Sequence, residues 1–188
     1  MNDSWELLYE QCKECTACSL WESRTNCVFG TGDRSADILF IGEAPGDNED
    51  KTGTPFVGRS GQLLNKYFDE VGIKREDVYI ANILKCRPPK NRDPLPSEEA
   101  ACIEFLHRQI ALLDPKIIVC LGRISASRII RPDYKITKEH GQWSEKDGCL
   151  ITAVYHPALL LRDPRKKGEM LTDMQKIKEK LDSLRGNE

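Results

Sequence analysis

Four short apolar runs constrain the fold of this 188-residue chain more than any other feature. They are rich in β-branched residues, nearly free of charge, and separated by longer segments in which apolar residues recur at helical spacing. Such runs are typical of strands that are buried on both faces of a parallel sheet. The runs lie at residues 38–41, 78–83, 117–121 and 150–154.

The intervening segments predict the helices that connect these strands. Residues 60–71 place large apolar side chains at helical spacing, and Gly72 follows as a stop signal. Further helices are predicted at 97–113, directly after Gly122, and at 169–184. This alternation predicts a three-layer α/β/α sandwich with a central, mainly parallel four-stranded sheet. Because residues 1–188 contain no repeat or long linker, we expect one domain.

The composition favours a globular protein that works inside the cell. Hydrophobic residues make up 39% of the chain and charged residues 31%. No segment approaches the roughly 18 apolar residues of a membrane span, and the first residues lack the pattern of a signal peptide. We therefore expect a cytoplasmic monomer with no membrane contact.

The eight cysteines indicate metal ligation or burial, because disulfides are rare in a reducing compartment. Cys12, Cys15 and Cys18 form a C-x-x-C-x-x-C run, and Cys86 and Cys102 follow far downstream. Two adjacent thiolates with two distant ones suit either zinc or an iron–sulfur cluster. The spacing alone leaves the metal open, and it leaves Cys12 as a rival of Cys15.

Polar, proline-containing segments follow three of the predicted strands, at residues 42–50, 82–89 and 155–162. Because the carboxyl ends of parallel strands meet at one edge of a sheet, where ligands bind, we expect a site there. Taken singly, its residues have ordinary structural interpretations. Asn82 suits a bond to neighbouring backbone, and an isolated histidine such as His156 is more often structural than catalytic.

Together, these segments resemble the motifs of the family 4 uracil-DNA glycosylases. The matching motifs are Gly42-Glu43-Ala44-Pro45-Gly46, Pro55-Phe56-Val57-Gly58, Asn82-x-x-Lys85-Cys86-Arg87-Pro88-Pro89 and His156-Pro157. The resemblance runs in order from about Cys15 to Arg162 and covers nearly the whole predicted domain. It implies an enzyme of base excision repair that hydrolyses the bond between uracil and deoxyribose, in single- or double-stranded DNA, and leaves an abasic site.

The resemblance also implies a [4Fe–4S] cluster as cofactor. The family holds it on a C-x-x-C pair and two distant cysteines, and the matching residues are Cys15, Cys18, Cys86 and Cys102. Cys12 is then surplus, and Cys120 is expected to be buried packing. Because hydrolysis of a glycosidic bond moves no electrons, we expect a structural cluster that holds the N-terminal segment and the Arg87 loop beside DNA.

The contacts with the base are likewise implied by the resemblance. Phe56 is expected to stack on the flipped uracil, and Asn82 to contact its O4 and N3–H. His156 is expected to donate a hydrogen bond to O2, where negative charge develops. Gly42 and Ala44 are expected to line the same pocket.

The residue that positions the attacking water is less defined. The family 1 enzymes have an aspartate where this chain has Ala44, so that carboxylate is absent. Glu43 and Glu49 are the nearest acids, and we expect both in the pocket, with Glu43 orienting the water. The alternative is that Glu49 and Asp50 only cap a turn.

The expected DNA contacts follow the same motifs. Basic residues gather at 85–92 and 162–167, where they would meet phosphates although the formal net charge is −2. The position most similar to the family's base-displacing wedge is Leu160, with its two leucine neighbours as rivals. The predicted contacts are Pro45, Arg87, Pro157, Leu160 and Arg162.

Other interpretations stay open at this stage. The same motifs would serve a glycosylase for other deaminated bases, and the cysteines would serve a non-enzymatic iron–sulfur DNA-binding module or a zinc-bound structural protein. A sliding clamp is a conceivable partner, although residues 183–188 show no docking motif.

Overall fold

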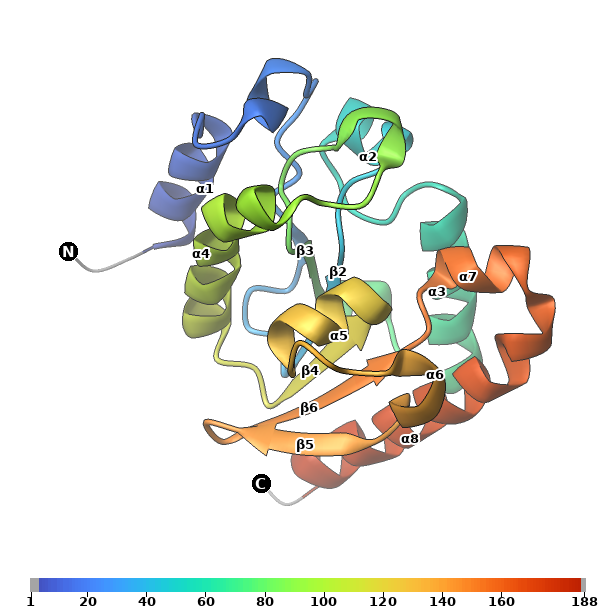
Figure 1. The fold of residues 1–188 in the computed structure, drawn as a ribbon. Helices are drawn as coiled ribbons and strands as arrows, with labels where there is room; N and C mark the ends of the chain where they lie inside the picture. Colours follow the sequence, from blue (N-terminus) through green and yellow to red (C-terminus); the bar gives the residue numbers. More distant parts are fainter. Residues whose placement is uncertain (1–3, 187–188) are drawn as a thin grey trace.

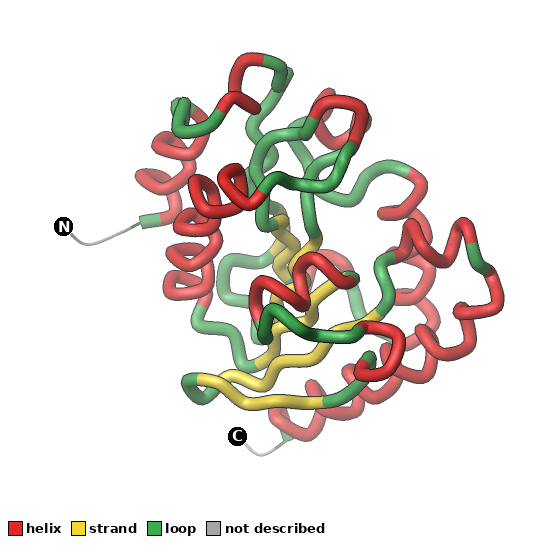
Figure 2. The backbone as a smooth tube through the Cα atoms, viewed as in Figure 1, coloured by secondary structure: helices red, strands yellow, loops and turns green. Residues whose placement is uncertain are grey.

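A six-stranded sheet lies between two layers of helices in the computed structural model, which describes residues 4–186 (Figures 1 and 2). Residues 1–3 and 187–188 lie outside the described part. They belong to the predicted domain, to the N-terminal residues considered for a signal peptide and to the C-terminal segment considered for clamp docking. The strand order is β1-β3-β2-β4-β6-β5. The strands are β1 (Thr31–Gly32), β2 (Ile38–Gly42), β3 (Tyr79–Asn82), β4 (Ile117–Leu121), β5 (Trp143–Lys146) and β6 (Cys149–Val154).

The helices connect these strands and cover both faces of the sheet. The α-helices of the described residues are α1 (Trp5–Lys13), α2 (Asp47–Thr52), α3 (Arg59–Val71), α4 (Pro96–Leu113), α5 (Arg123–Ile129), α6 (Ile136–Glu139), α7 (Pro157–Arg162) and α8 (Lys167–Arg185). Short 3-10 helices are η1 (Ser19–Glu22), η2 (Arg75–Asp77), η3 (Pro89–Asn91) and η4 (Pro164–Lys166). Among the helices of residues 4–186, none is long and apolar enough to cross a membrane.

The predicted parallel core is confirmed, but the sheet is larger than the predicted four strands. β3, β2, β4 and β6 are parallel neighbours. β1 and β5 add antiparallel edges. β1 has only two residues, and β5 is mostly exposed and polar. Neither edge strand therefore contains the apolar run from which the other four were predicted.

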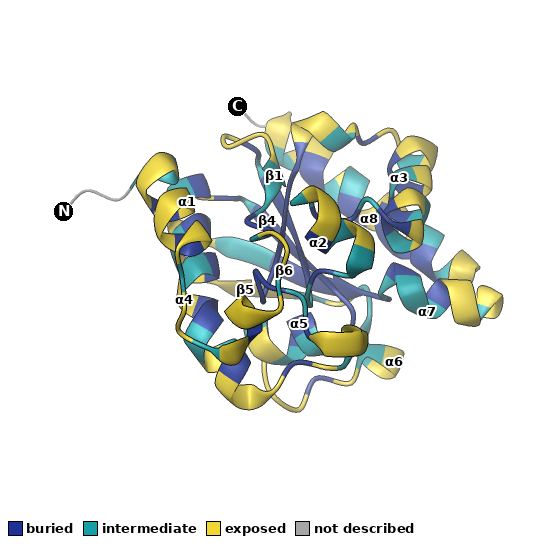
Figure 3. Cartoon of the chain, turned by 90° about the horizontal axis from the view of Figure 1, so that it is seen from above, coloured by how far each residue is buried: buried dark blue, intermediate teal, exposed yellow. Residues whose placement is uncertain are grey.

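Alternate residues of the central strands divide the core between the two helical layers. Ile38 and Phe40 of β2 face the cluster that contains α3 and α8. Leu39 and Ile41 face the cluster that contains α4. The central strands are mostly dark blue in Figure 3 because they are buried on both sides, whereas the outer helical faces are exposed. This two-sided burial is the reason that the strands read as continuous apolar runs.

The register of the parallel strands brings the sequence motifs to one edge. Gly42 at the end of β2 pairs with Asn82 at the end of β3. Leu121 at the end of β4 pairs with Val154, which precedes Tyr155 and His156. The carboxyl ends of all four parallel strands therefore open toward the same region.

Two of the segments predicted to be loops contain short helices. α2 and α7 have six residues each, which is too short for a clear helical period. α7 begins with Pro157, which suits the first helical position because its missing N–H has no partner to lose there. The segment after the fourth predicted strand thus contains a helix where a loop is predicted.

We expect Phe68→Ala to lower the free energy of unfolding by about 3–5 kcal/mol, because it leaves a cavity between α3 and the sheet. Phe68 is 1% exposed, and its ring centroid lies 4.9 Å from that of Phe40. Urea denaturation measures the loss. Leu7→Ala is the control, since Leu7 is 41% exposed; equal losses in the two variants would contradict the packing described here.

Candidate active site and cysteine cavity

Asn82 ends β3, and its side-chain oxygen lies beside the backbone of Gly42 at the end of β2. The residue is 2% exposed, and its Oδ1 is the buried side-chain oxygen that lacks a hydrogen-bond partner among the described residues. Such an oxygen costs about 1–3 kcal/mol when it stays unsatisfied. A Cβ at position 42 would lie 2.3 Å from this oxygen, so only Gly42 leaves the amide in place. The arrangement is suited to a ligand that donates one hydrogen bond.

Phe56 places an aromatic ring beside this amide. A Cβ at position 42 would also lie 2.6 Å from Phe56 Cε2, so the ring packs against the Gly42 backbone. The ring centroid lies 5.7 Å from that of His156. The backbone of Phe56 has φ +54°, in the left-handed region that residues other than glycine rarely adopt. A flat ligand therefore meets a ring, an amide and an imidazole in one place.

Glu49 holds the turn that carries Phe56. One oxygen of its carboxylate, Oε1, accepts hydrogen bonds from Val57 N–H at 3.0 Å and Gly58 N–H at 2.8 Å. Asp50 is buried and accepts from Thr25 N–H at 2.9 Å. Both acids therefore accept hydrogen bonds from backbone N–H groups, as the capping alternative expects. Contact of Glu49 with a substrate stays a prediction.

His156 is the N-cap of α7 and is fixed by that helix. Its Nδ1 accepts a hydrogen bond from Ala158 N–H at 3.0 Å, so the ring proton of the neutral form lies on Nε2. Burial lowers the pKa of His156 to about 4, and the positive charge of Arg162 acts in the same direction. At neutral pH the imidazole is thus an uncharged hydrogen-bond donor.

Glu43 follows β2 directly and is half-buried. Burial, followed by the negative charges of Asp93 and Glu99, raises the pKa of Glu43 to about 7, although Arg123 opposes the shift. A carboxyl that ionises near neutral pH is suited to accepting a proton or orienting water.

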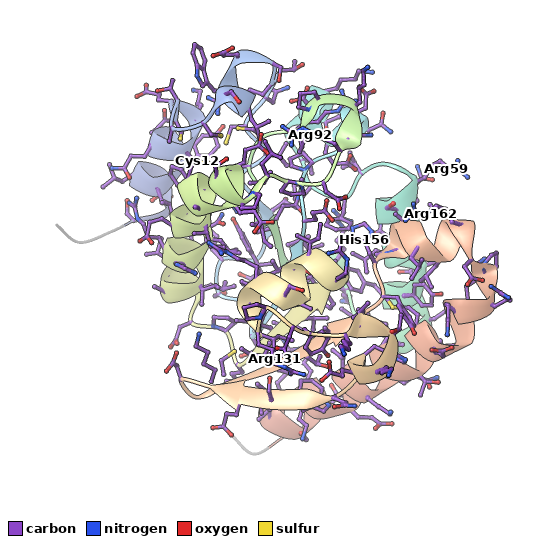
Figure 4. All side chains as sticks on the ribbon, viewed as in Figure 1. Cys12, Arg59, Arg92, Arg131, His156 and Arg162 are labelled. Carbon is purple, nitrogen blue, oxygen red and sulfur yellow. The ribbon has the colours of Figure 1, made fainter. Side chains whose placement is uncertain are left out.

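Arg162 and Arg59 lie on the two helices that border this site. Both residues are exposed. α3 and α7 pack against each other, and Figure 4 shows the two arginines beyond His156 on the same side of the molecule. They offer positive charge on the side of the molecule where His156 lies.

Three predicted DNA contacts do not fit the structure. Leu160 is 0% exposed and belongs to the core, whereas Leu161 is 38% exposed. Pro45 and Pro157 are buried. A side chain that enters DNA must be accessible, so burial argues against the side chains of Leu160, Pro45 and Pro157 as DNA contacts, whereas Leu161 is accessible. The prediction failed because α7 turns the adjacent Leu159 and Leu160 toward the core.

The first basic segment is not a free positive patch either. Lys85 is 1% exposed. Arg87 donates to Asp47 Oδ1 at 2.7 Å, and Arg92 donates to Glu98 Oε1 at 2.6 Å. Most of the positive charge predicted for residues 85–92 is therefore buried or neutralised by a carboxylate.

The four predicted cluster ligands line one cavity. The cysteines on its wall are Cys12, Cys15, Cys18, Cys86 and Cys102. Burial raises the pKa of Cys86 to about 11 and that of Cys102 to about 12, so these thiols stay protonated in the absence of a cation. Within residues 4–186, no three His, Cys, Asp or Glu side chains are grouped closely enough to hold a single metal ion.

Cys12 is paired with another thiol. Its Sγ lies 3.0 Å from Cys27 Sγ, on the side where α1 packs against the segment before β1. This contact favours Cys15 over Cys12 as the ligand. Cys120 is 0% exposed within β4, which agrees with its predicted role in packing.

Lys85 provides the test of whether the cavity fits a cluster. Its Nζ donates to Asn82 O at 2.8 Å and to Gln109 Oε1 at 2.6 Å, which are both neutral acceptors. Burial lowers the pKa of Lys85, and negative charge on nearby thiols such as Cys102 acts against that shift. A cluster bound by four thiolates would supply such charge. Lys85 N–H and Arg24 Nη1 also donate to Cys102 and Cys86 Sγ, at 3.3 and 3.1 Å. These donors fit an anionic iron–sulfur group. Sequence reasoning missed the role of Lys85, because in sequence it reads as one of a basic run.

Comparison with known proteins agrees with this geometry. Residues 29–181 match the model of the uracil DNA glycosylase superfamily. The chain belongs to this superfamily and to its type-4 branch. It is 45% identical to a type-4 uracil-DNA glycosylase of Thermotoga maritima, with 92% of each chain covered. It is 45% identical to one of Sulfurisphaera tokodaii, with 94% of this chain and 84% of the relative covered. A third, from Archaeoglobus fulgidus, is 41% identical over 94% of this chain and 93% of the relative.

We expect Cys86→Ala to remove the visible absorbance of this type-4 enzyme and to lower its melting temperature, because the cavity loses a ligand. Cys149→Ala is the matched control, since Cys149 is half-buried on β6, away from the cavity. Absorbance spectra, iron analysis and thermal denaturation measure both effects. A Cys86→Ala protein with full colour and unchanged stability would contradict the ligand assignment. If the protein without substitution is colourless and contains zinc, the result would favour the zinc-bound structural protein.

Proposed function

We propose that this chain hydrolyses the N-glycosidic bond of deoxyuridine in DNA and leaves an abasic site. The observation that carries the proposal is the buried, unpartnered Oδ1 of Asn82 beside Gly42, where Phe56 also packs and brings its ring close to that of His156. The names of the type-4 relatives support the same reaction. An enzyme that acts on a base must take it out of the stack, and this pocket has the flat wall and polar floor that a flipped base requires.

Recognition of uracil follows from the two ends of the Asn82 amide. Oδ1 accepts from uracil N3–H, and Nδ2 donates to O4. Cytosine presents an unprotonated N3 and an amino group at these positions. The same amide orientation would place the acceptor Oδ1 against the acceptor N3, and the donor Nδ2 against the donor amino group. Phe56 stacks on the base without distinguishing its edges. Gly42 and Ala44 line the approach to the pocket, where the backbone of Gly42 lets the base come close.

His156 stabilises the departing base. As the glycosidic bond breaks, negative charge builds on uracil O2 and the sugar becomes a cation. The Nε2–H of neutral His156 donates to O2, and its position is set beforehand by the bond from Ala158. A fixed donor of this kind contributes about 3–4 kcal/mol to the transition state.

Glu43 orients the attacking water in its ionised form. Its raised pKa, about 7, leaves a substantial fraction of both forms at neutral pH. The carboxylate also places negative charge near the developing sugar cation. Glu49 supports the pocket by holding the turn of Phe56 and contacts the substrate through its second oxygen.

A [4Fe–4S] cluster on Cys15, Cys18, Cys86 and Cys102 is part of the proposal. The shared cavity and the donors that Lys85 N–H and Arg24 direct at Cys102 and Cys86 support it. The group supplies no step of the hydrolysis. Its place beside Lys85 keeps the N-terminal segment and the Arg87 loop next to the pocket.

DNA contact is proposed for the exposed rim of the pocket. Arg162 meets a phosphate, and Leu161 fills the space that the flipped nucleotide leaves. Arg87 adds a phosphate contact once DNA competes with Asp47 for its guanidinium. The substrate-facing surface is thus narrow, which agrees with a net charge of −2.

We expect the purified protein to cleave a uracil-containing oligonucleotide after hot alkali, as seen on a sizing gel. Asn82→Ala and His156→Ala should each lower the single-turnover rate, the latter by about 100- to 1,000-fold because one fixed donor is lost. His107→Ala is the control, since His107 is exposed on α4. No cleavage by a protein that keeps its visible absorbance would direct the search to other deaminated bases and then to a DNA-binding module.

We expect the cleavage rate to rise with pH through the pKa of Glu43, about 7, and to level off above it, because only the ionised carboxyl orients water. His156, with a pKa lowered to about 4, stays neutral throughout and adds no second step near neutrality. Single-turnover rates from pH 5 to 9 measure the profile, and Glu43→Gln should flatten it. A rate that falls as pH rises through this range would mean that the protonated carboxyl acts.

A further inference from the structure

The turn that carries Phe56 adopts a conformation that its own sequence does not favour. Phe56 has φ +54° and is 6% exposed. For a bulky residue other than glycine, this conformation persists only when the surroundings impose it. The start of α3 contributes by close approach, because a Cβ at Gly61 would lie 1.8 Å from Phe56 O. Only a glycine there leaves room for the turn.

Arg75 binds the carbonyl groups of the same turn. It lies in η2, just before β3, and is partly buried. Its Nη2 donates to Pro55 O at 2.7 Å, and its Nη1 donates to Phe56 O at 3.0 Å. The guanidinium therefore contacts both carbonyl groups next to the strained residue.

Asn65 fixes this guanidinium from the side of α3. Its Oδ1 accepts from Arg75 Nη1 at 2.7 Å. Burial lowers the pKa of Arg75, while Glu49 acts against the shift. The planar fork of an arginine supplies several donors in one fixed geometry, whereas a lysine supplies a single flexible ammonium.

The turn is thus held from both sides by opposite charges. Glu49 accepts from the N–H groups of Val57 and Gly58, and Arg75 donates to the carbonyl groups of Pro55 and Phe56. The glutamate belongs to the recognised first motif. The arginine lies outside every motif. In sequence it follows α3, whereas the turn precedes that helix.

We propose that Arg75 is the positioning residue for the base-stacking ring of Phe56. By fixing both carbonyl groups, it sets the ring against Gly42 and beside the Asn82 amide, so that a flipped uracil is held with its O2 toward His156. The inference rests on the proposed function. Because Arg75 is directed at the turn and not at DNA, its loss slows bond cleavage more than it weakens DNA binding.

The test compares Arg75→Met with the unchanged protein in single-turnover cleavage at saturating enzyme. We expect a fall of about 10- to 100-fold, because a small misplacement of the stacking ring disturbs the reacting geometry. Affinity for DNA with a non-cleavable 2′-fluorodeoxyuridine should change about threefold or less, since contacts with phosphate remain. Arg75→Lys should recover part of the rate. Arg34→Met is the matched control, since Arg34 is exposed and pairs with Glu6.

A double-mutant cycle separates positioning from general stability. If Arg75 acts through Phe56, Arg75→Met should lower the rate of a Phe56→Ala enzyme only about twofold, because the ring that it positions is gone. Equal falls in both backgrounds would overturn the inference, as would an unchanged rate with a lower melting temperature alone. Should Arg75→Met fail to fold, Asn65→Ala, which frees the guanidinium on one side, should show a smaller effect with the same coupling. No cleavage by the unchanged protein would overturn the proposed function and this inference with it, whereas failure of the cycle alone leaves the proposed function standing.

Discussion

The rest of the site depends on one constraint: the buried amide oxygen of Asn82 has no hydrogen-bond partner among the described residues. The strand register sets it opposite Gly42, and the missing side chain of that glycine leaves space for the amide and for the ring of Phe56. Folding accepts an unsatisfied buried oxygen at a cost of about 1–3 kcal/mol. That cost is recovered only when a donor enters the pocket. The proposed discrimination between bases would therefore be built into the fold before any DNA binds.

The same residue connects the pocket to the cysteine cavity. Lys85 donates to the backbone carbonyl of Asn82 through Nζ and to Cys102 Sγ through its N–H. One buried lysine thus spans the distance between the reading amide and the proposed cluster. Burial lowers the pKa of this lysine, and negative charge on the cavity side would act against that shift. The proposed cluster would need no redox chemistry to affect the pocket, because it would fix the segment on which Asn82 lies.

The sequence predicts the four central strands and the convergence of their ends, because two-sided burial leaves continuous apolar runs. It fails for β5, which is polar, and for α7, which is too short to show a period, so Leu160 was assigned to DNA although it lies in the core. The residues predicted to face the base come from their motifs, and the structure brings Gly42, Phe56 and Asn82 together and sets His156 beside Phe56. Arg75 was not found, because a charged residue in a turn carries no sign that it binds a distant backbone carbonyl. Residues that act through their side chains are visible in a sequence, whereas those that hold another segment are visible only in three dimensions.

Burial shifts the pKa values of His156 and Glu43 in opposite directions, but the consequence is the same for both groups. It lowers the pKa of His156 to about 4 and raises that of Glu43 to about 7, so it favours the neutral form of each. In the proposed mechanism the leaving base becomes an anion, and the uncharged N–H group of His156 donates to it. The sugar becomes a cation, and the ionised form of Glu43, which a pKa of about 7 makes available at neutral pH, faces it. A protonated histidine would bind the anion more tightly, but it would oppose the sugar cation and the nearby Arg162. The low pKa of His156 is therefore consistent with a site that stabilises charge separation with a fixed dipole instead of a full charge.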